Sequence, residues 1–248
     1  MNLIAKLGTN AIFDSEKQKI RKDVLEQLAK DAQIFLNEKD KNNKENQLII
    51  VTSGAVGCGK KRFNKNNYNE TGLKQAQASV GQPILMQKYI SVFNRYSLEV
   101  SQFLLTYHDL VFISGIKNIK QTYEHLKNNK IIPIVNENDV TATAELRFGD
   151  NDALTTQLAI ALNFDTIINY TKRGALIKKG EPIKQTNRFY LGYYDKLETS
   201  GTGFGGLKSK LKSAKKAVEA GKTYIIAKAG DSFFKVLSQE VNATKFYK

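Results

Sequence analysis

Acidic and amide side chains crowd a short part of this chain, between residues 136 and 152. Five carboxylates and three carboxamides lie within these 17 residues. They form two motifs, Asn-Glu-Asn-Asp at 136–139 and Phe-Gly-Asp-Asn-Asp at 148–152, which follow the apolar run 131–135. Such groups after a buried strand suit a small-molecule site whose ligand carries an ammonium group or a magnesium ion. The alternative is a solvated acidic loop. The basic character of the rest of the chain favours the ligand site.

Three glycine-bearing turns could hold an anion. They are 6–9 (Lys-Leu-Gly-Thr), 53–57 (Ser-Gly-Ala-Val-Gly) and 201–206 (Gly-Thr-Gly-Phe-Gly-Gly). Glycine lets backbone N–H groups approach a phosphate, and a helix N-terminus or a nearby lysine adds favourable charge. The segment 201–206 also fits G-x-G-x-x-G, but no convincing strand precedes it and no ribose-binding acid follows. Together with the acidic segment, the turns indicate phosphoryl transfer without a P-loop or a protein-kinase signature.

The elements that must position these residues alternate along the chain. Apolar runs predict strands at 3–7, 48–51, 99–105, 131–135, 166–170 and 224–227. Helical spacing predicts helices at 23–38, 74–96, 116–128, 152–162 and 208–220, the second interrupted near Gly81 and Pro83. We expect 172–198 to be irregular and 233–237 to form a last short element. Strand–helix alternation with continuously apolar strands predicts one α/β domain with a mainly parallel sheet covered on both faces.

The bulk properties restrict the class of protein. A net charge of +14 invites a nucleic-acid interpretation, but the lysines are scattered and no zinc-finger or RNA-recognition motif is present. A single cysteine, Cys58, suits a reducing compartment and is interpreted as a packing residue. His108 and His125 lack metal-ligand spacing, and Ser53 is interpreted as a hydrogen-bonding contact because it lies outside a nucleophile-elbow motif. Without a signal peptide or membrane-spanning stretch, we expect a cytoplasmic protein.

Motifs along nearly the whole chain resemble the amino-acid kinase family and, within it, the glutamate 5-kinases. The matching segments include Lys-Leu-Gly-Thr (6–9), Val-Thr-Ser-Gly-Ala-Val (51–56), Val-Gly-Gln (80–82), Pro-Ile-Val-Asn-Glu-Asn-Asp (133–139), Phe-Gly-Asp-Asn-Asp (148–152) and Gly-Gly-Leu-Lys-Ser-Lys-Leu (205–211). The resemblance implies a three-layer α/β/α sandwich around a mainly parallel sheet. It also implies ATP toward the C-terminal half and glutamate toward the N-terminal half.

Matching positions imply the site residues. The implied catalytic residues are Lys6, Asp152 and Lys210, and the implied glutamate-binding residues are Ser53, Asp139 and Asn151. The implied ATP-binding residues are Lys6, Gly8, Thr171, Lys172, Phe204, Gly205, Gly206, Leu207, Lys208, Ser209 and Lys210. The cofactors would be ATP and Mg²⁺, the ion being held mainly through the nucleotide phosphates and not by a metal site of the protein.

The resemblance also implies partners. ATP would phosphorylate the side-chain carboxylate of L-glutamate, as the first step of proline biosynthesis. The enzyme would be a homo-oligomer that hands its product to glutamyl phosphate reductase, with no nucleic-acid or membrane partner. We expect residues 1–248 to be a single kinase domain without the C-terminal RNA-binding-type domain of many relatives.

Two positions depart from the family pattern. Lys172 stands where an acid is usual, and Phe204 lies inside the glycine turn. Three alternatives therefore stay open: another amino-acid kinase with a changed donor or acceptor, a catalytically impaired regulatory homologue, and a basic nucleic-acid-binding protein.

Overall fold

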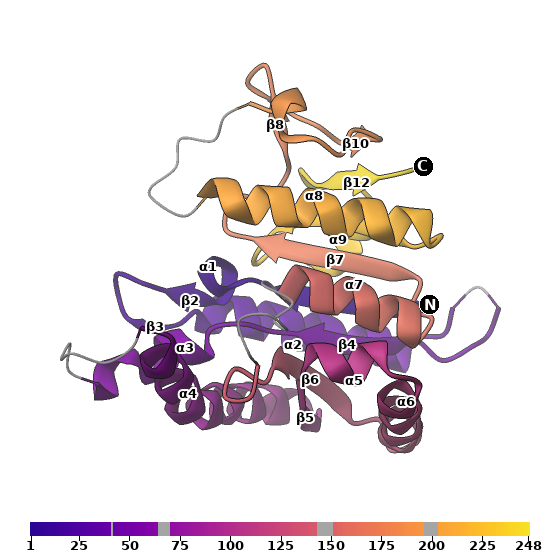
Figure 1. Ribbon diagram of the computed structural model, residues 1–248. Coiled ribbons are helices and arrows are strands. Elements are labelled where there is room, and N and C mark those ends of the chain that lie inside the picture. Colours follow the sequence, from indigo (N-terminus) through magenta and orange to yellow (C-terminus); the bar gives the residue numbers. More distant parts are fainter. Residues whose placement is uncertain (41, 64–69, 143–150, 196–202) are drawn as a thin grey trace.

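The computed structural model describes residues 1–248 except 41, 64–69, 143–150 and 196–202 (Figure 1). Within the described residues, the main sheet has eight strands in the order β10-β12-β11-β7-β1-β4-β6-β5. Their bounds are β1 Asn2–Leu7, β4 Gln47–Val51, β5 Val100–Leu105, β6 Ile132–Glu137, β7 Thr166–Thr171, β10 Gln185–Thr186, β11 Thr223–Lys228 and β12 Thr244–Phe246.

The centre of the sheet is parallel. The first strand lies between β4 and β7: Leu3 pairs with Leu48 on one side and with Thr166 on the other. Strands β6, β5 and β11 continue the parallel arrangement, whereas β12 runs antiparallel to β11. The prediction of a mainly parallel sheet is therefore confirmed.

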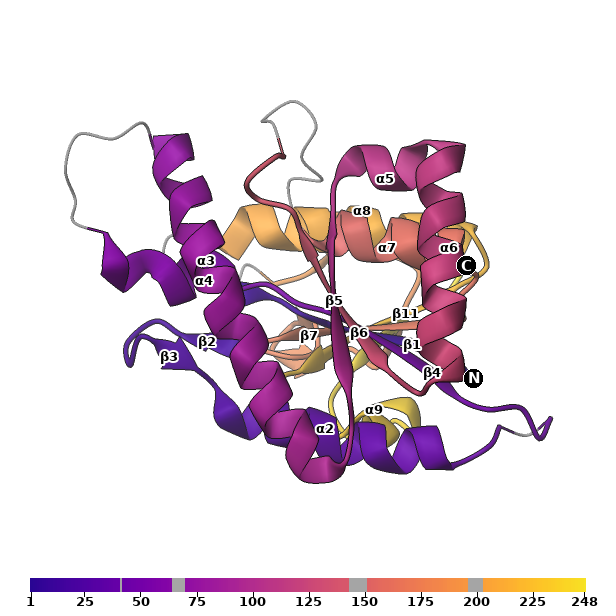
Figure 2. The ribbon, with the colours of Figure 1, turned by 90° about the horizontal axis from the view of Figure 1, so that it is seen from below.

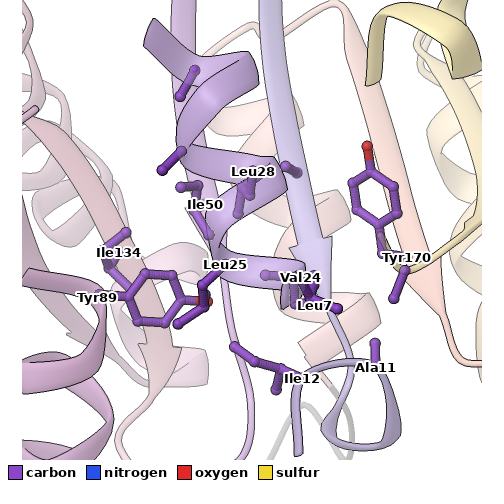
Figure 3. Packing of buried hydrophobic residues seen from close by; sticks show 14 of the residues in the cluster. Leu7, Ala11, Ile12, Val24, Leu25, Leu28, Ile50, Tyr89, Ile134 and Tyr170 are labelled. Carbon is purple, nitrogen blue, oxygen red and sulfur yellow. The ribbon is translucent and has the colours of Figure 1, made fainter. Parts of the chain in front are cut away.

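Helices cover both faces of the sheet (Figure 2). One face carries α2 (Lys22–Asn37), α4 (Glu70–Phe93) and α9 (Phe233–Leu237), which enclose a core with Leu25, Ile50 and Ile134 (Figure 3). The other face carries α5 (Tyr107–Val111), α6 (Ile113–Asn128), α7 (Asn151–Ala161) and α8 (Gly203–Glu219) over a second core. Successive strand residues point to opposite faces, so continuously apolar strands supply both cores. The result is the expected three-layer α/β/α sandwich.

The remaining elements are short. At the ends of β1 and β4 lie α1 (Thr9–Ile12), the antiparallel pair β2 (Phe13–Asp14) and β3 (Lys19–Ile20), and α3 (Ala55–Gly59). A second antiparallel pair, β8 (Ile177–Lys178) with β9 (Glu181–Pro182), lies within the segment predicted to be irregular, as does β10. That prediction was wrong for these strands, because pairs of residues this short carry no periodic pattern.

Helix α4 crosses α3 at a backbone-to-backbone contact. A Cβ atom on Gly81 would lie 1.8 Å from the carbonyl oxygen of Ala55, and one on Gly59 would lie 1.9 Å from that of Gln77. Glycine is thus required at both positions for steric reasons. The predicted interruption of α4 near Gly81 and Pro83 was wrong: the helix runs continuously from Glu70 to Phe93. An internal proline costs about 3 kcal/mol, and burial of the side chains that follow it, such as Leu85, offsets this cost.

A buried carboxylate ties the C-terminal segment to α2. Asp31 is 3% exposed. Its Oδ2 accepts the backbone N–H of Phe233 at 3.0 Å, and its Oδ1 accepts Ser232 Oγ at 3.0 Å and Gln27 Nε2 at 2.9 Å. Burial raises the pKa of Asp31, and these hydrogen bonds offset only part of that effect. The contact fixes the start of α9 against the sheet.

Candidate active site

The polar segments meet at the carboxyl edge of the sheet. Because β1, β4, β6 and β7 are parallel, the residues that follow each strand emerge at the same edge. These residues include Gly8 after β1, Ser53 after β4 and Asp139 after β6. The first turn of α8 lies at the same side of the molecule, on the left in Figure 1. The topology therefore assembles chemistry that the sequence spreads over more than 200 residues.

A buried aspartate joins the two lysines. Asp152, in the first turn of α7, is fully buried. Its Oδ1 accepts a hydrogen bond from Lys6 Nζ, and its Oδ2 accepts one from Lys210 Nζ at 2.8 Å. Lys6 comes from β1 and is 3% exposed, whereas Lys210 comes from α8 and is 19% exposed. The three residues expected from the family resemblance are therefore in direct contact.

The charges in this cluster depend on one another. Burial by itself would raise the pKa of Asp152, but the charges and hydrogen bonds of Lys6 and Lys210 outweigh burial and hold that pKa well below its usual range. Asp152 is therefore ionised at neutral pH. Two ammonium groups and one carboxylate leave a local charge of about +1, which suits a phosphate ligand.

A second cluster is built from amides. Asn151 Nδ2 lies 2.8 Å from Ser53 Oγ, 2.8 Å from Asn136 Oδ1 and 2.7 Å from the carbonyl oxygen of Thr52. Asn136 Nδ2 in turn donates to Gln82 Oε1 at 2.9 Å. Within the described part of the chain, the buried atoms Gln82 Nε2 and Asn151 Oδ1 have no hydrogen-bond partner. Buried polar atoms without a protein partner suit contacts to a polar ligand.

The clusters adjoin because Asn151 and Asp152 are consecutive. At the start of α7, Asn151 thus contacts Asn136 of β6 and Ser53 after β4, whereas Asp152 contacts the lysines of β1 and α8. The structure brings together five of the predicted residues: Lys6, Ser53, Asn151, Asp152 and Lys210. Asp139 is half-buried in the turn after β6, where its backbone N–H donates to the carbonyl oxygen of Glu137.

Other predicted ATP-binding residues follow β1 and β7. A Cβ atom on Gly8 would lie 3.5 Å from Lys6 Nζ. Thr171 Oγ1 accepts the backbone N–H of Gly174 at 2.9 Å and so shapes the turn after β7. Lys172 is exposed in that turn.

On α8, Gly206, Leu207 and Ser209 are half-buried, and Lys208 is exposed. Phe204 and Gly205 lie outside the residues whose surroundings the structure describes. Their predicted contact to ATP therefore stays a prediction.

Four further polar residues support the clusters. Asn136 contacts Asn151 and is itself bonded to Gln82. Asn169 contacts Asp152 and is itself bonded to Tyr224. Asn136 and Gln82 lie within motifs that match the family, but the sequence assigned no role to either residue. One feature of the sequence could have identified Asn169: it is an amide inside the otherwise apolar centre of β7.

The structure offers no protein metal centre among the described residues, where no group of three or more His, Cys, Asp or Glu side chains could hold an ion. His108 and His125 are both exposed, on α5 and α6. Burial raises the pKa of the Cys58 thiol to about 11, in line with its interpretation as a packing residue. Across the described ranges, no helix is long and apolar enough to cross a membrane.

The α/β/α sandwich thus carries a lysine–aspartate–lysine cluster and a neighbouring amide cluster at the carboxyl edge of its sheet. The chain belongs to the amino acid kinase family, whose model matches residues 1–228.

Several curated relatives are similar over most of the chain. A protein named glutamate 5-kinase from Prochlorococcus marinus (strain AS9601) is 36% identical over 230 residues, which cover 88% of this chain and 62% of that relative. The glutamate 5-kinase of Dictyoglomus turgidum is 32% identical over 255 residues, which cover 99% of this chain and 67% of that relative. The chain thus spans about three fifths of the length of the Prochlorococcus relative.

Solved structures share the fold at low identity. A carbamate kinase from Giardia lamblia bound to AMP-PNP matches with a TM-score of 0.65 at 12% identity, covering 100% of this chain and 98% of that one. An isopentenyl phosphate kinase from T. acidophilum gives the same score at 9% identity, covering 99% and 100%. These likenesses concern the fold alone.

Proposed function

We propose that this protein is a glutamate 5-kinase, which transfers the γ-phosphoryl group of ATP to the side-chain carboxylate of L-glutamate. The observation that carries the proposal is the contact of Asp152 with Lys6 and Lys210, directly beside the amide cluster of Asn151. The relatives named glutamate 5-kinase support the choice of acceptor.

The lysine cluster would receive the phosphates. Lys6 and Lys210 come from opposite sides of Asp152, so their ammonium groups are held in place before a ligand arrives. Preorganised charge of this kind stabilises the negative charge that moves during phosphoryl transfer. Asp152 would position the lysines and would not touch the reacting atoms.

The amide cluster would hold the acceptor. Ser53, Asn151 and Asp139 can offer donors to a carboxylate and an acceptor to the α-ammonium group. The buried donor Gln82 Nε2 lies in the same network. Since Asn151 and Asp152 are adjacent, an acceptor bound there would lie next to the phosphate subsite, and such proximity is a large part of phosphoryl-transfer catalysis.

The reaction would need no general base. The side chain of glutamate has a pKa of about 4.3 and is ionised at neutral pH. One carboxylate oxygen attacks the γ-phosphorus and forms a P–O bond. The bond from that phosphorus to the β,γ-bridging oxygen breaks, and its electron pair leaves with ADP. When bound, Mg²⁺ carried by the nucleotide phosphates would add charge neutralisation.

We extend the proposal to the domain, the pathway and the oligomeric state. We propose that residues 1–248 act as one kinase domain, since strands from residue 2 to residue 246 share one sheet. The acyl phosphate product is reactive toward water, which favours hand-over to glutamyl phosphate reductase in a cytoplasmic proline pathway. A homo-oligomer is the state we expect to find in solution.

The reaction is tested by ADP release at saturating Mg-ATP, with L-glutamate, L-aspartate or N-acetylglutamate as acceptor. Hydroxylamine should trap a γ-glutamyl hydroxamate in the glutamate reaction. Turnover with aspartate or acetylglutamate that equals turnover with glutamate would overturn the acceptor assignment. An absence of ADP release with all three would overturn the kinase assignment.

A further inference from the structure

Asn169 is a buried amide in the middle of the sheet. It lies on β7, where its register neighbours are Lys6 on β1 and Ile226 on β11. The residue is 1% exposed, and the strand around it is otherwise apolar at its centre. Placing an amide there costs free energy unless its polar atoms find partners. The nitrogen of Asn169 has partners, whereas its Oδ1 has none among the described residues. Its contacts therefore indicate why an amide occupies this position.

The amide nitrogen of Asn169 contacts two buried groups. Nδ2 donates to Asp152 Oδ1 at 2.7 Å and to the hydroxyl oxygen of Tyr224 at 2.6 Å. The opposite orientation of the amide would point its oxygen at the Asp152 carboxylate and face two acceptors toward each other. The orientation is thus fixed by chemistry, and Asp152 Oδ1 receives a neutral donor in addition to the ammonium group of Lys6.

Among the described residues, three donors to Asp152 come from three different elements. Lys6 reaches it from β1, Lys210 from α8 and Asn169 from β7. Two ammonium groups can each draw a carboxylate toward themselves, and a third donor limits its rotation. Since the amide carries no charge, it restrains Asp152 without changing the cluster's charge of about +1, which a phosphate ligand uses.

We infer that Asn169, itself held by Tyr224, is a positioning residue for phosphoryl transfer. It holds Asp152, and Asp152 holds the two lysines at the phosphate subsite. Tyr224 is 1% exposed on β11 and places its hydroxyl group against the same amide nitrogen. The inference rests on the proposed function for its kinetic test but not for its binding test.

The kinetic test compares Asn169→Leu and Tyr224→Phe with a matched control, Tyr123→Phe. Tyr123 is also a buried tyrosine bonded to a side-chain amide, Gln47 Oε1 at 2.9 Å, but Gln47 begins β4 and so lies at the opposite edge of the sheet. Asn169→Leu should lower kcat about tenfold, equivalent to about 1.4 kcal/mol, and Tyr224→Phe about threefold. The KM for glutamate should change by less than about twofold, and the control should keep its kcat. If Asn169→Leu and Tyr224→Phe lower the melting temperature as much as Tyr123→Phe does but keep the wild-type kcat, the inference is overturned.

A third variant, Asn169→Asp, gives a readout that a purely structural role would not move. It places a second carboxyl group against Asp152, and a neighbouring like charge raises the pKa of one of the two. Below that raised pKa the new carboxyl group is protonated and can donate to Asp152, as the amide does. Above it the two carboxylates repel each other and cancel more of the lysine charge. The kcat of the variant relative to wild type should therefore fall as pH rises, and a pH-independent ratio would contradict the inference.

The binding test needs no acceptor. Calorimetric titration with ATP should give a dissociation constant several-fold weaker for Asn169→Leu than for wild type and Tyr123→Phe. Equal ATP affinity in all three proteins would overturn the positioning role. A wild-type protein that binds ATP but phosphorylates no glutamate would instead refute the proposed function, and the affinity comparison would still decide the role of Asn169.

Discussion

Replacing Gly81 by alanine tests the contact between α3 and α4. The added Cβ atom would lie 1.8 Å from the carbonyl oxygen of Ala55 and 2.6 Å from the backbone nitrogen of Gly59. Real Cβ contacts essentially never fall below 3.0 Å, so the first distance must grow by at least 3.0 − 1.8 = 1.2 Å. Both obstacles are backbone atoms, so no side-chain rotation relieves the clash and the two helices must separate.

We expect Gly81→Ala to destabilise the fold by about 3 kcal/mol, the upper end of the usual cost of overpacking. For a chain of this size, such a loss lowers the melting temperature by about 6–12 °C. The same displacement disturbs the amide cluster, because Gln82 follows Gly81 and Ser53 precedes α3. The KM for glutamate should therefore rise while the lysine cluster keeps its contacts.

The matched control is Gly72→Ala on the same helix. A Cβ atom at Gly72 has nothing within 4 Å. Alanine there gains the usual helix preference over glycine, about 0.5–1 kcal/mol. Thermal and urea unfolding of both variants give the comparison. If Gly81→Ala proves as stable as Gly72→Ala, with an unchanged KM, the proposed backbone contact is absent and the reasoning fails.

Four further outcomes are expected. Lys6→Ala and Lys210→Ala should each lower kcat by about 10²–10³ with a smaller change in the KM for glutamate, and steady-state kinetics showing the reverse would exchange the two subsites. Asn151→Ala should raise that KM by about 10- to 150-fold, the effect of losing about 1.5–3 kcal/mol of charged hydrogen bonding; an unchanged KM would place glutamate elsewhere. Lys172, which cannot accept hydrogen bonds from ribose, should leave ATP and GTP used within about tenfold of each other, and Lys172→Asp should tighten ATP binding in calorimetry; tight ATP-selective binding unaffected by the change would put residue 172 outside the site. Asp31→Ala should lower the free energy of unfolding by about 1–3 kcal/mol because the first N–H of α9 loses its acceptor. Since burial raises the pKa of Asp31, the stability that Asp31 contributes is greatest at acid pH and falls as pH rises through that pKa. The loss of unfolding free energy, measured with urea, should therefore be larger at pH 4 than at pH 7, and a pH-independent loss would contradict this.

The sequence predicts the long strands at the centre of the sheet better than the short strands at its edge. The strand predicted at 166–170 is β7, Thr166–Thr171, because a short run rich in apolar and β-branched residues favours a buried strand. Strand β12 was not predicted, since its three residues form a strand only by pairing with β11 and β10. Helix α4 was predicted as interrupted because local rules for Pro83 do not include the packing around it.

For the site too, sequence motifs identify residues but not the contacts between them. Motifs identify Lys6, Asp152 and Lys210 as a set, but only the folded chain brings them within hydrogen-bonding distance. The roles of Gln82 and Asn169 depend on partners 54 and 17 residues away. Local sequence patterns contain no information on such distant pairs, so these roles can be recognised only in the folded structure.

The position of β1 in the sheet also governs how a newly made chain can fold. The strand precedes both of its neighbours in the chain but lies in the centre of the sheet; these neighbours are β4, complete at residue 51, and β7, complete at residue 171. At roughly 5–20 residues per second, the second neighbour leaves the ribosome about 6–24 s after the first. During that interval the apolar strand keeps one open edge, which can pair with other chains. In a nascent chain, β1 can therefore be paired on both sides only after residue 171 has emerged.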